Sequence, residues 1–308
     1  MNDDLAVAEL RVICGPTAAG KSALAMRLAE RHDLEIVCAD SRQIYRGFDI
    51  GTAKPNATEC ARVRHHCIDV AEPVERWSAA RWSDDARRSI DRIGVSRTLV
   101  VGGTGFYLRA LVAPLFESPV LDPVRRADLA TSLDELPTNE LARWVRALDA
   151  PCAHLGRTQL LRAVEVALLT GVRLSDLQRT GSRPGAFRAR WLVVDPLRRL
   201  GALIEQRLDE MLTSGWLDEV RALEARVPPE APAWQACGYG VARDLLLGKM
   251  DASRARETRL IATRQYAKRQ RTWFRHQIAD AELVTIVNPL EADCETRVEN
   301  WWTSGDSA

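Results

Sequence analysis

The residues best suited to chemistry lie near the start of the chain, where the sequence reads GPTAAGKS from Gly15 to Ser22. This segment has the pattern of a phosphate-binding loop: a glycine, four residues, then glycine, lysine and a serine or threonine. The glycines let backbone N–H groups approach an anion, Lys21 adds a positive charge, and the Ser22 hydroxyl can bind Mg²⁺. An apolar run precedes the loop and an amphipathic helical pattern follows it, as the motif requires. The sequence therefore predicts that the loop binds a phosphate group, without saying which molecule carries it.

A carboxylate follows another predicted strand. Asp40 comes directly after the apolar run 35–39, and ligands of parallel sheets bind at the carboxyl ends of strands. Asp40 should therefore face the same crevice as the phosphate loop, where it could bind Mg²⁺, cap a helix or act as a general base. Gln43 and Tyr45 follow it and suit a planar, hydrogen-bonding substrate such as a nucleobase.

The most familiar use of a phosphate loop is ATP hydrolysis or phosphoryl transfer, and the residues at the end of a third predicted strand test this interpretation. Such enzymes usually have an apolar strand that ends in a metal-binding aspartate. The run 98–101 ends instead in Gly102-Gly103-Thr104-Gly105, with no carboxylate at its tip. This weakens a kinase or ATPase interpretation without excluding it.

Four basic residues are spaced to share one face of a predicted C-terminal helix. Arg264, Lys268, Arg271 and Arg275 step by four, three and four positions. Two interpretations remain open: a solvated charged face, or contact with the phosphates of a nucleic acid or a diphosphate substrate.

Two polar segments between these motifs have simpler interpretations. The stretch 49–55 reads as a polar loop. His65 and His66 are adjacent, and adjacent side chains cannot both face one metal ion from a strand or a helix. We therefore expect a structural or substrate-edge role for the histidines rather than a metal site.

The alternation of apolar runs with helical patterns predicts an α/β fold of the P-loop NTPase-like type, with a parallel sheet flanked by helices. Between residues 117 and 186 the pattern is nearly all helical, and it is punctuated by proline and glycine. We interpret residues 117–186 as a helical insertion domain, and residues 1–116 and 187–308 as the core with its C-terminal helices. The predicted core strands are 10–14, 35–39, 98–101 and 191–194.

Composition sets broad limits. The 308 residues are 46% hydrophobic and 28% charged, and the net charge is +1, so any basic surface must be local. The seven cysteines are scattered without a C-x-x-C pair, which favours buried free thiols over disulfides or zinc. There is no run of 18 apolar residues, and the acidic N-terminus lacks a signal-peptide layout. We expect a cytoplasmic, non-membrane protein.

Taken together, the motifs resemble the tRNA dimethylallyltransferase (tRNA isopentenyltransferase) family of the bacterial type. They occur in the family's order over roughly residues 12 to 278. The segments that carry the resemblance are GPTAAGKS, DSRQIY, DIGTAKP, VRHHCIDV, WSAARW, VGGTGFYLRAL, QLLRAVEV and TRQYAKRQRTWFR. DIGTAKP and the last of these are the specific ones, because the phosphate loop occurs in many unrelated proteins.

This resemblance implies transfer of a dimethylallyl group from dimethylallyl diphosphate to N6 of adenosine 37 in tRNA, next to the anticodon. The product would be N6-isopentenyladenosine, the partners would be dimethylallyl diphosphate and a tRNA anticodon stem-loop, and the enzyme would act as a monomer. The alternatives are an isopentenyltransferase for free AMP or ADP, a P-loop small-molecule kinase, and a non-catalytic RNA-binding module.

The resemblance also assigns roles to residues at the diphosphate. Asp40 would be the general base, and Lys21 and Thr104 would complete the catalytic set. Ser22 would bind Mg²⁺. The implied diphosphate-binding residues are Gly15, Pro16, Thr17, Ala18, Ala19, Gly20, Lys21, Ser22 and Arg264.

A second set would contact the RNA. The chain departs from the family pattern at 155–159, which lacks the usual Asn-Asp before an arginine, and at Gly240, where a basic residue is usual. Both departures fall in segments expected to face RNA. The implied tRNA-binding residues are Asp40, Ser41, Arg42, Gln43, Thr104, Arg126, Thr158, Gln159, Leu160, Leu161, Arg162, Gly238 and Tyr239.

Overall fold

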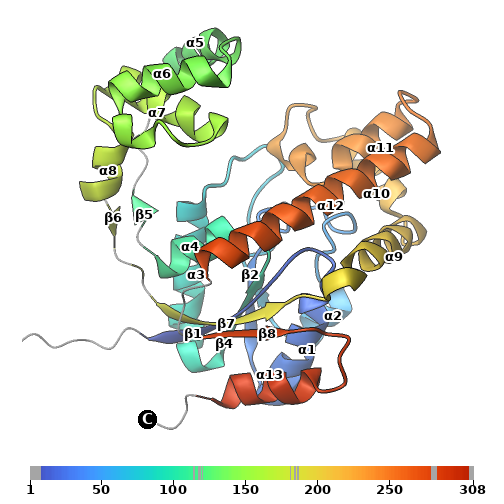
Figure 1. Cartoon of the computed structure of the whole chain (residues 1–308). Helices are drawn as coiled ribbons and strands as arrows, with labels where there is room; N and C mark the ends of the chain where they lie inside the picture. The colour runs from blue at the N-terminus through green and yellow to red at the C-terminus, as the bar shows by residue number, and fades with distance from the viewer. Residues whose placement is uncertain are drawn as a thin grey trace, which may run out of the picture. The chain divides into compact units, whose positions relative to one another are not determined.

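The chain forms two compact units (Figure 1). One is drawn from Met1–Val112 and Ala186–Ala308, and the other from Ala113–Gly185. The boundaries predicted from the sequence, at residues 117 and 186, lie outside the described residues. The computed structural model describes residues 8–304 apart from 114, 117, 118, 120, 181, 184, 186 and 279–282.

A six-stranded sheet with the order β3-β2-β4-β1-β7-β8 forms the centre of the first unit. Every neighbouring pair is parallel, so the predicted α/β fold is confirmed. The four expected strands are all present, and the short strands β3 and β8 form the two edges. The bounds are β1 Glu9–Cys14, β2 Glu35–Ala39, β3 His65–His66, β4 Thr98–Gly102, β7 Arg188–Val194 and β8 Val284–Val287.

Helices bury their apolar faces against this sheet. Side chains of α1 (Lys21–His32) and α13 (Cys294–Thr303) share one buried cluster with side chains of the central strands. Beside the end of β2, Trp82 of α3 (Ala79–Ile93) stacks on Tyr107 of α4 (Gly105–Val112), with ring centroids 4.8 Å apart. The Trp82 indole N–H also donates to the carbonyl of Cys38, 3.0 Å away. These contacts fix the strand end that precedes Asp40.

The C-terminal helices of this unit run across the carboxyl ends of the strands. The helical region expected at 197–227 is interrupted at Gly215, whose φ of 87° ends one helix and begins the next. The region expected at 252–278 is one long helix, α12, which contacts α4, α9 and α11 (Figure 1). The bounds are α2 Ala57–Arg62, α9 Leu200–Thr213, α10 Trp216–Glu224, α11 Tyr239–Leu246 and α12 Ala252–Gln277.

The second unit is helical and has a core of its own. Its helices bury leucine and valine side chains in one cluster, and two short strands pair antiparallel beside them. This arrangement matches the helical insertion expected from the sequence. The bounds are α5 Pro123–Asp134, α6 Thr138–Leu148, α7 Arg157–Thr170, α8 Leu174–Thr180, β5 Leu115–Phe116 and β6 Ser182–Arg183.

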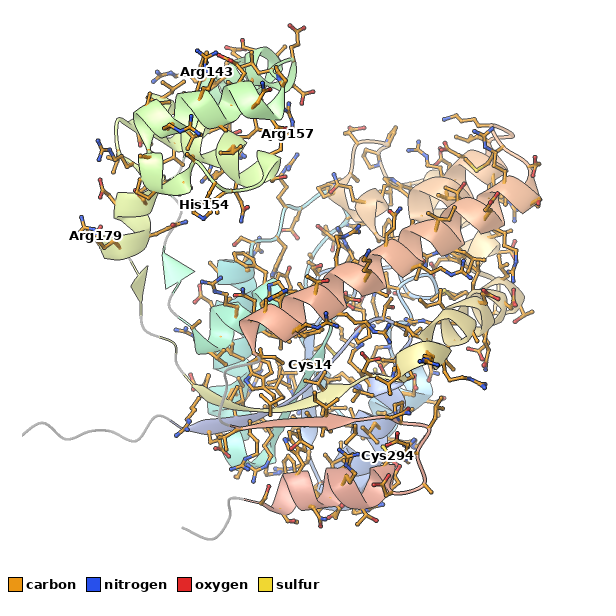
Figure 2. All side chains as sticks on the ribbon, in the orientation of Figure 1. Cys14, Arg143, His154, Arg157, Arg179 and Cys294 are labelled. Carbon is orange, nitrogen blue, oxygen red and sulfur yellow. The ribbon has the colours of Figure 1, made fainter. Side chains whose placement is uncertain are left out.

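The cysteines are free, as expected. Five are buried, including Cys14 in β1 and Cys294 in α13 (Figure 2), while Cys60 and Cys237 are half-buried. Across the described ranges, no helix combines the length and apolar character needed to cross a membrane.

The close approach of β2 and β4 predicts a sharp stability difference between two glycines. A Cβ on Gly102 would lie 2.1 Å from the backbone oxygen of Ala39, which cannot move without breaking the sheet. We expect Gly102→Ala to destabilise the protein by about 3 kcal/mol. Gly201→Ala, in α9, is the control, because a Cβ there meets nothing within 4 Å and should stabilise slightly. Thermal unfolding measures both, and equal melting temperatures would contradict this packing.

Candidate active site

The phosphate-binding loop predicted from the sequence connects β1 to α1. Gly15 has a φ of 145°, and a Cβ there would lie 2.2 Å from the carbonyl oxygen of Val194. Gly20 has a φ of 87° and immediately precedes α1. The Lys21 ammonium donates to the carbonyl of Pro16 at 2.7 Å, across the open side of the loop. The loop and the helix N-terminus therefore have the geometry of an anion site.

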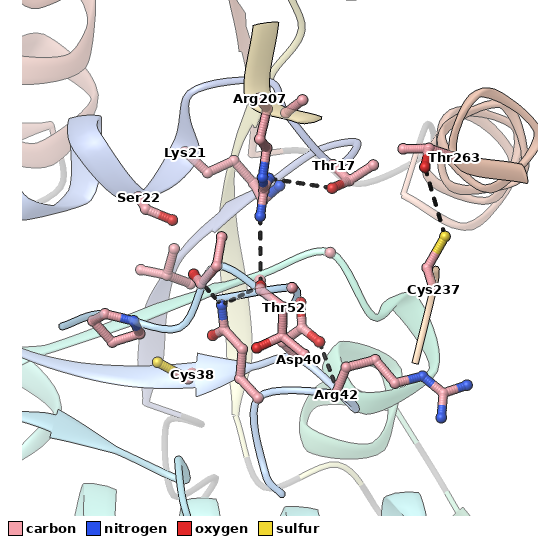
Figure 3. A pocket seen from close by; sticks show the side chains of 18 of the residues that line it. Thr17, Lys21, Ser22, Cys38, Asp40, Arg42, Thr52, Arg207, Cys237 and Thr263 are labelled. Carbon is pink, nitrogen blue, oxygen red and sulfur yellow. Dashed lines mark hydrogen bonds between the residues drawn. The ribbon is translucent and has the colours of Figure 1, made fainter. Parts of the chain in front are cut away.

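A pocket of about 140 Å³ opens in front of this loop (Figure 3). Its walls come from the loop, from the ends of β2 and β4, and from α9 and α12. Four other loop residues, Gly15, Pro16, Ala19 and Gly20, are not part of its lining. The predicted site residues that line the pocket are Thr17, Ala18, Lys21, Ser22, Asp40, Arg42 and Gln43.

The ends of β2 and β4 are joined by hydrogen bonds that orient the predicted base. The Asp40 carboxylate accepts from the backbone N–H of Arg42 at 2.8 Å, so it caps a turn and not a helix. The Ser41 N–H donates to the Thr104 hydroxyl at 3.0 Å, and the Thr104 N–H donates to the carbonyl of Ala39 at 3.1 Å. Thr104 therefore acts next to Asp40, as a brace between two strand ends.

A buried glutamine of α12 joins the same region from the other side. Gln270, which is 7% exposed, accepts from the Thr17 N–H and donates to the Gly103 carbonyl, both at 2.8 Å. A Cβ on Gly103 would lie 2.4 Å from the Gln270 amide nitrogen, and one on Gly105 would lie 2.3 Å from the Trp273 ring. The glycines of the β4 loop thus leave room for side chains of α12 to pack against the loop backbone. Two motifs that are far apart in the sequence form one contact.

The sequence did not single out Arg207, which lies beside the phosphate loop. Its guanidinium makes a long 3.3 Å hydrogen bond to the Thr17 hydroxyl (Figure 3). Burial lowers the pKa of Arg207. Burial, together with the nearby Arg207 charge, also lowers the pKa of Lys21 to about 8. The sequence does contain a signal for Arg207, because its position relative to Ile204, Leu208 and Met211 puts all four on one face of a helix. In the structure this face of α9 lines the pocket.

Comparisons with known proteins agree with this geometry. The family model described as IPP transferase matches residues 43–277, and the one described as isopentenyl transferase matches residues 8–75. This chain belongs to the IPP transferase family. A tRNA dimethylallyltransferase of Pelobacter propionicus is 43% identical over 92% of this chain and 94% of its own length. One of Stenotrophomonas maltophilia is 42% identical over 86% and 89% of the two chains.

Solved structures of the family have the same fold. The tRNA isopentenylpyrophosphate transferase of Bacillus halodurans is 30% identical, with a TM-score of 0.66 over 95% of this chain and 94% of that chain. A eukaryotic dimethylallyltransferase, described as acting on tRNA, has a TM-score of 0.74 over 97% of this chain and 76% of that chain. At 24% identity, this second likeness supports the fold alone.

The structure does not place Arg264, which the resemblance assigns to the diphosphate, in the pocket lining. Arg264 is exposed and pairs with Glu205 of α9, and it is not among the residues that line the pocket. Arg271 pairs with Asp195 at 2.9 Å and donates to the carbonyl of Leu197 at 2.7 Å. The basic face of α12 is therefore partly neutralised by neighbouring carboxylates. Arg207, in contrast, lies beside the loop, at the Thr17 hydroxyl.

Two of the residues expected at the RNA have buried side chains instead. Tyr239 is fully buried, and its hydroxyl donates to Glu219 and accepts from the Gly51 N–H at 3.0 Å. Leu160 lies in the core of the insertion. Both side chains support the fold and offer no surface to a macromolecule. Gly238, beside Tyr239, has a φ of 93° and lies against Arg259 of α12.

In the insertion, other predicted RNA residues are accessible. Thr158 and Gln159 are exposed, and Arg126 and Arg162 both pair with Glu165, at 3.1 and 3.4 Å. In segment 155–159, which differs from the family pattern, Arg157 (Figure 2) donates to the carbonyls of Leu136 and Asp134. These bonds satisfy carbonyl groups at the C-terminal end of α5. Leu161 is partly buried against the insertion core.

The segment interpreted as a polar loop is a folded support. Lys54 is 3% exposed and pairs with Asp49 and Asp69. The Gln43 amide donates to the carbonyl of Ala53 at 2.9 Å, which holds this support against the pocket. His66 pairs with Glu35 at 2.7 Å, and no described cluster of carboxylates, histidines and cysteines could hold a metal ion.

The Gln270 contact predicts a loss of stability when its hydrogen bonds are removed. Gln270→Leu leaves the Thr17 N–H and the Gly103 carbonyl unpaired, at a cost of about 1–3 kcal/mol for each buried group. Gln265→Leu is the matched control, because Gln265 is exposed on the same helix. Urea unfolding should show a clear loss for the first variant and little change for the second. A similar stability for both would contradict the contact.

The lowered pKa of Lys21 predicts that anion binding takes up a proton. The free protein has a charged Lys21 below about pH 8 and a neutral one above it, so anion affinity should fall as the pH rises through 8. A bound anion favours the charged form, so binding of inorganic pyrophosphate at pH 8 should take up about half a proton. Calorimetry in two buffers of different ionisation enthalpy measures this uptake. Lys21→Met should abolish it, and an unchanged uptake would assign the proton elsewhere.

Proposed function

We propose that this enzyme transfers the dimethylallyl group of dimethylallyl diphosphate to N6 of adenosine 37 in tRNA, next to the anticodon. The observation that carries the proposal is that a carboxylate, Asp40, and a phosphate loop line one pocket. Membership of the family supports it, and so do curated relatives with the printed name tRNA dimethylallyltransferase. The phosphate loop then holds a leaving group, and no phosphoryl group moves.

The acceptor needs a base, which is the role proposed for Asp40. The lone pair of an adenine N6 amine is delocalised into the ring, so the amine is a weak nucleophile until a proton can leave. One Asp40 oxygen is oriented by the Arg42 N–H, and no described residue donates to the other oxygen. The carboxylate can therefore take the N6 proton as the new carbon–nitrogen bond forms. Thr104 keeps the two strand ends in place while this occurs.

The donor needs stabilisation of the charge that develops on diphosphate as the allylic carbon–oxygen bond breaks. Lys21, the N–H groups of the loop beyond Thr17, and Arg207 are positioned to provide it. The Thr17 N–H is already bound to Gln270 and would not take part. The nearby Asp40 carboxylate also raises the pKa of Arg207 and so favours the charged guanidinium.

Mg²⁺ fits this site in the manner of other phosphate loops. The Ser22 hydroxyl lines the pocket, and Mg²⁺ usually takes its remaining ligands from substrate phosphates and water. The lack of a carboxylate cluster among the described residues is therefore no obstacle. When bound, the ion would neutralise part of the diphosphate charge.

The RNA side of the proposal uses the exposed polar residues that remain. The adenosine must leave its stack to reach the pocket, at a cost of a few kcal/mol. Arg42 and Gln43 line the pocket and would contact the flipped nucleotide, with Ser41 beside them. In the insertion, Arg126, Arg162 and the exposed Thr158 and Gln159 would contact the anticodon arm.

Mass spectrometry tests the activity directly. The protein, dimethylallyl diphosphate and Mg²⁺ are mixed with an unmodified anticodon stem-loop that carries adenosines at positions 36 and 37. A gain of one C5 unit that is lost when position 37 is changed supports the proposal. A gain with free AMP and none with the stem-loop would favour the free-nucleotide branch, and consumption of ATP with neither would favour a kinase.

The base role predicts a large loss of rate without loss of RNA binding. Asp40→Asn keeps the size and one acceptor oxygen but removes the proton acceptor, so turnover should fall about 10²–10⁴-fold. Glu59→Gln is the matched control, because Glu59 also lines the pocket and loses the same charge, and its effect should be much smaller. Single-turnover rates and stem-loop affinity are measured for both. Equal rates in the two variants would remove Asp40 from the base role.

A further inference from the structure

Arg259 of α12 is a buried cation that forms no salt bridge with any described carboxylate. It is 7% exposed and lines the pocket. Within the described chain, its Nη1 atom has no hydrogen-bond partner, and no carboxylate is among the groups that influence its charge. A buried guanidinium with unfilled donors is costly unless an anion completes it.

A second cation lies close to Arg259, which increases this cost. Arg207 lines the same pocket, and each guanidinium is disfavoured by burial, which lowers the pKa of both. The Arg259 charge lowers the pKa of Arg207 further. The neighbouring Cys237 and Tyr239 side chains offset the burial of Arg259 only in part, and the Tyr239 hydroxyl already donates to Glu219.

The other arginines of α12 show that unpaired charge is not a general property of this helix. Arg256 pairs with Asp209, Arg264 with Glu205 and Arg271 with Asp195. None of these three arginines lines the pocket. Arg259 lines the pocket, and none of the described carboxylates forms an ion pair with it, although Asp40 and Glu59 line the same pocket.

The surroundings of Arg259 are shaped to keep it in place. A Cβ on Gly238 would lie 2.2 Å from the Arg259 Nε atom, so a residue without a side chain is needed there. The guanidinium carbon lies 5.1 Å from the centre of the Trp216 ring, within cation–π range. The stem is thus fixed on two sides while the Nη1 donor has no described partner.

We propose that Arg259 adds a further phosphate-binding donor beside Arg207, beyond the phosphate loop, and that it holds a phosphate of one of the two substrates. The ligand chemistry is a phosphate oxyanion, which matches the planar donors of two guanidinium groups. The source is either the diphosphate of the allyl donor or a backbone phosphate beside the flipped nucleotide. This inference rests on the proposed function in one respect: the phosphate is taken to belong to one of the two substrates of the proposed transfer.

The test compares two variants of α12 that lose the same charge. Arg259→Gln removes the subsite donor, while Arg256→Gln removes a half-buried arginine one turn away that pairs with Asp209. Binding of inorganic pyrophosphate and of the anticodon stem-loop is measured for each by calorimetry. A charge-assisted hydrogen bond is worth about 1.5–3 kcal/mol, so Arg259→Gln should weaken one of the two ligands about 10- to 100-fold. Arg256→Gln should weaken neither to that extent.

The two binding measurements show whether the bound phosphate belongs to the allyl diphosphate or to the RNA. Weaker pyrophosphate binding with an unchanged stem-loop assigns the subsite to the diphosphate. Weaker stem-loop binding assigns it to the RNA, and a neutral methylphosphonate linkage on either side of position 37 should then weaken the wild type but not Arg259→Gln. Unchanged affinity for both ligands overturns the proposal. Since neither measurement requires turnover, a failure of the proposed transfer would be seen separately.

A stability measurement separates this role from a structural one. Arg259→Met keeps the stem over Trp216 and removes the unpaired charge, so its melting temperature in the absence of ligand should equal or exceed that of the wild type. A much lower melting temperature together with unchanged affinities would make Arg259 a structural residue and overturn the proposal. Pyrophosphate or stem-loop should raise the melting temperature less in Arg259→Met than in the wild type.

Discussion

The buried amide of Gln270 is the interaction on which the site depends. It satisfies a donor of the phosphate loop and an acceptor of the β4 loop at once, from a helix more than 150 residues away in the chain. A buried amide with both ends paired fixes distances on both sides, because either unpaired group would be costly. The glycines at 103 and 105 let α12 approach closely enough for this contact. The phosphate loop, the β4 loop and α12 therefore hold their positions together.

The pocket combines this rigid frame with an excess of buried positive charge. Lys21 and Arg207 lie in or beside the phosphate loop, and burial lowers the pKa of each. Such groups cost stability in the free protein and become favourable when a polyanion binds. The same low-dielectric setting strengthens the attraction for a diphosphate that gains charge as it leaves. Binding of a polyanion thus explains why the protein keeps buried positive charges that would only destabilise a purely structural core.

The segment 49–55 supports the site through buried contacts and also forms part of the pocket lining. The segment 49–55 buries Lys54 between two carboxylates and presents Gly51 to the Tyr239 hydroxyl. A Cβ on Gly51 would lie 2.2 Å from the Trp216 indole nitrogen, so this glycine is required by packing. A distinctive motif in an enzyme family can therefore reflect the frame that holds a catalytic strand end.

The sequence alone determined the phosphate loop, the four main strands and the position of Asp40, because each depends on short-range spacing or on local hydrophobic periodicity. It missed β3, because two residues are too few to show a period. Only the tertiary structure decided which arginines of α9 and α12 line the pocket: Arg207 and Arg259 do, while Arg264 pairs with Glu205 of α9. The rotation of α12 about its axis is set by its contacts with α4, α9 and α11, and no local pattern records those contacts. The roles of Gln270 and Tyr239 were hidden for the same reason, since their partners lie far away in the chain.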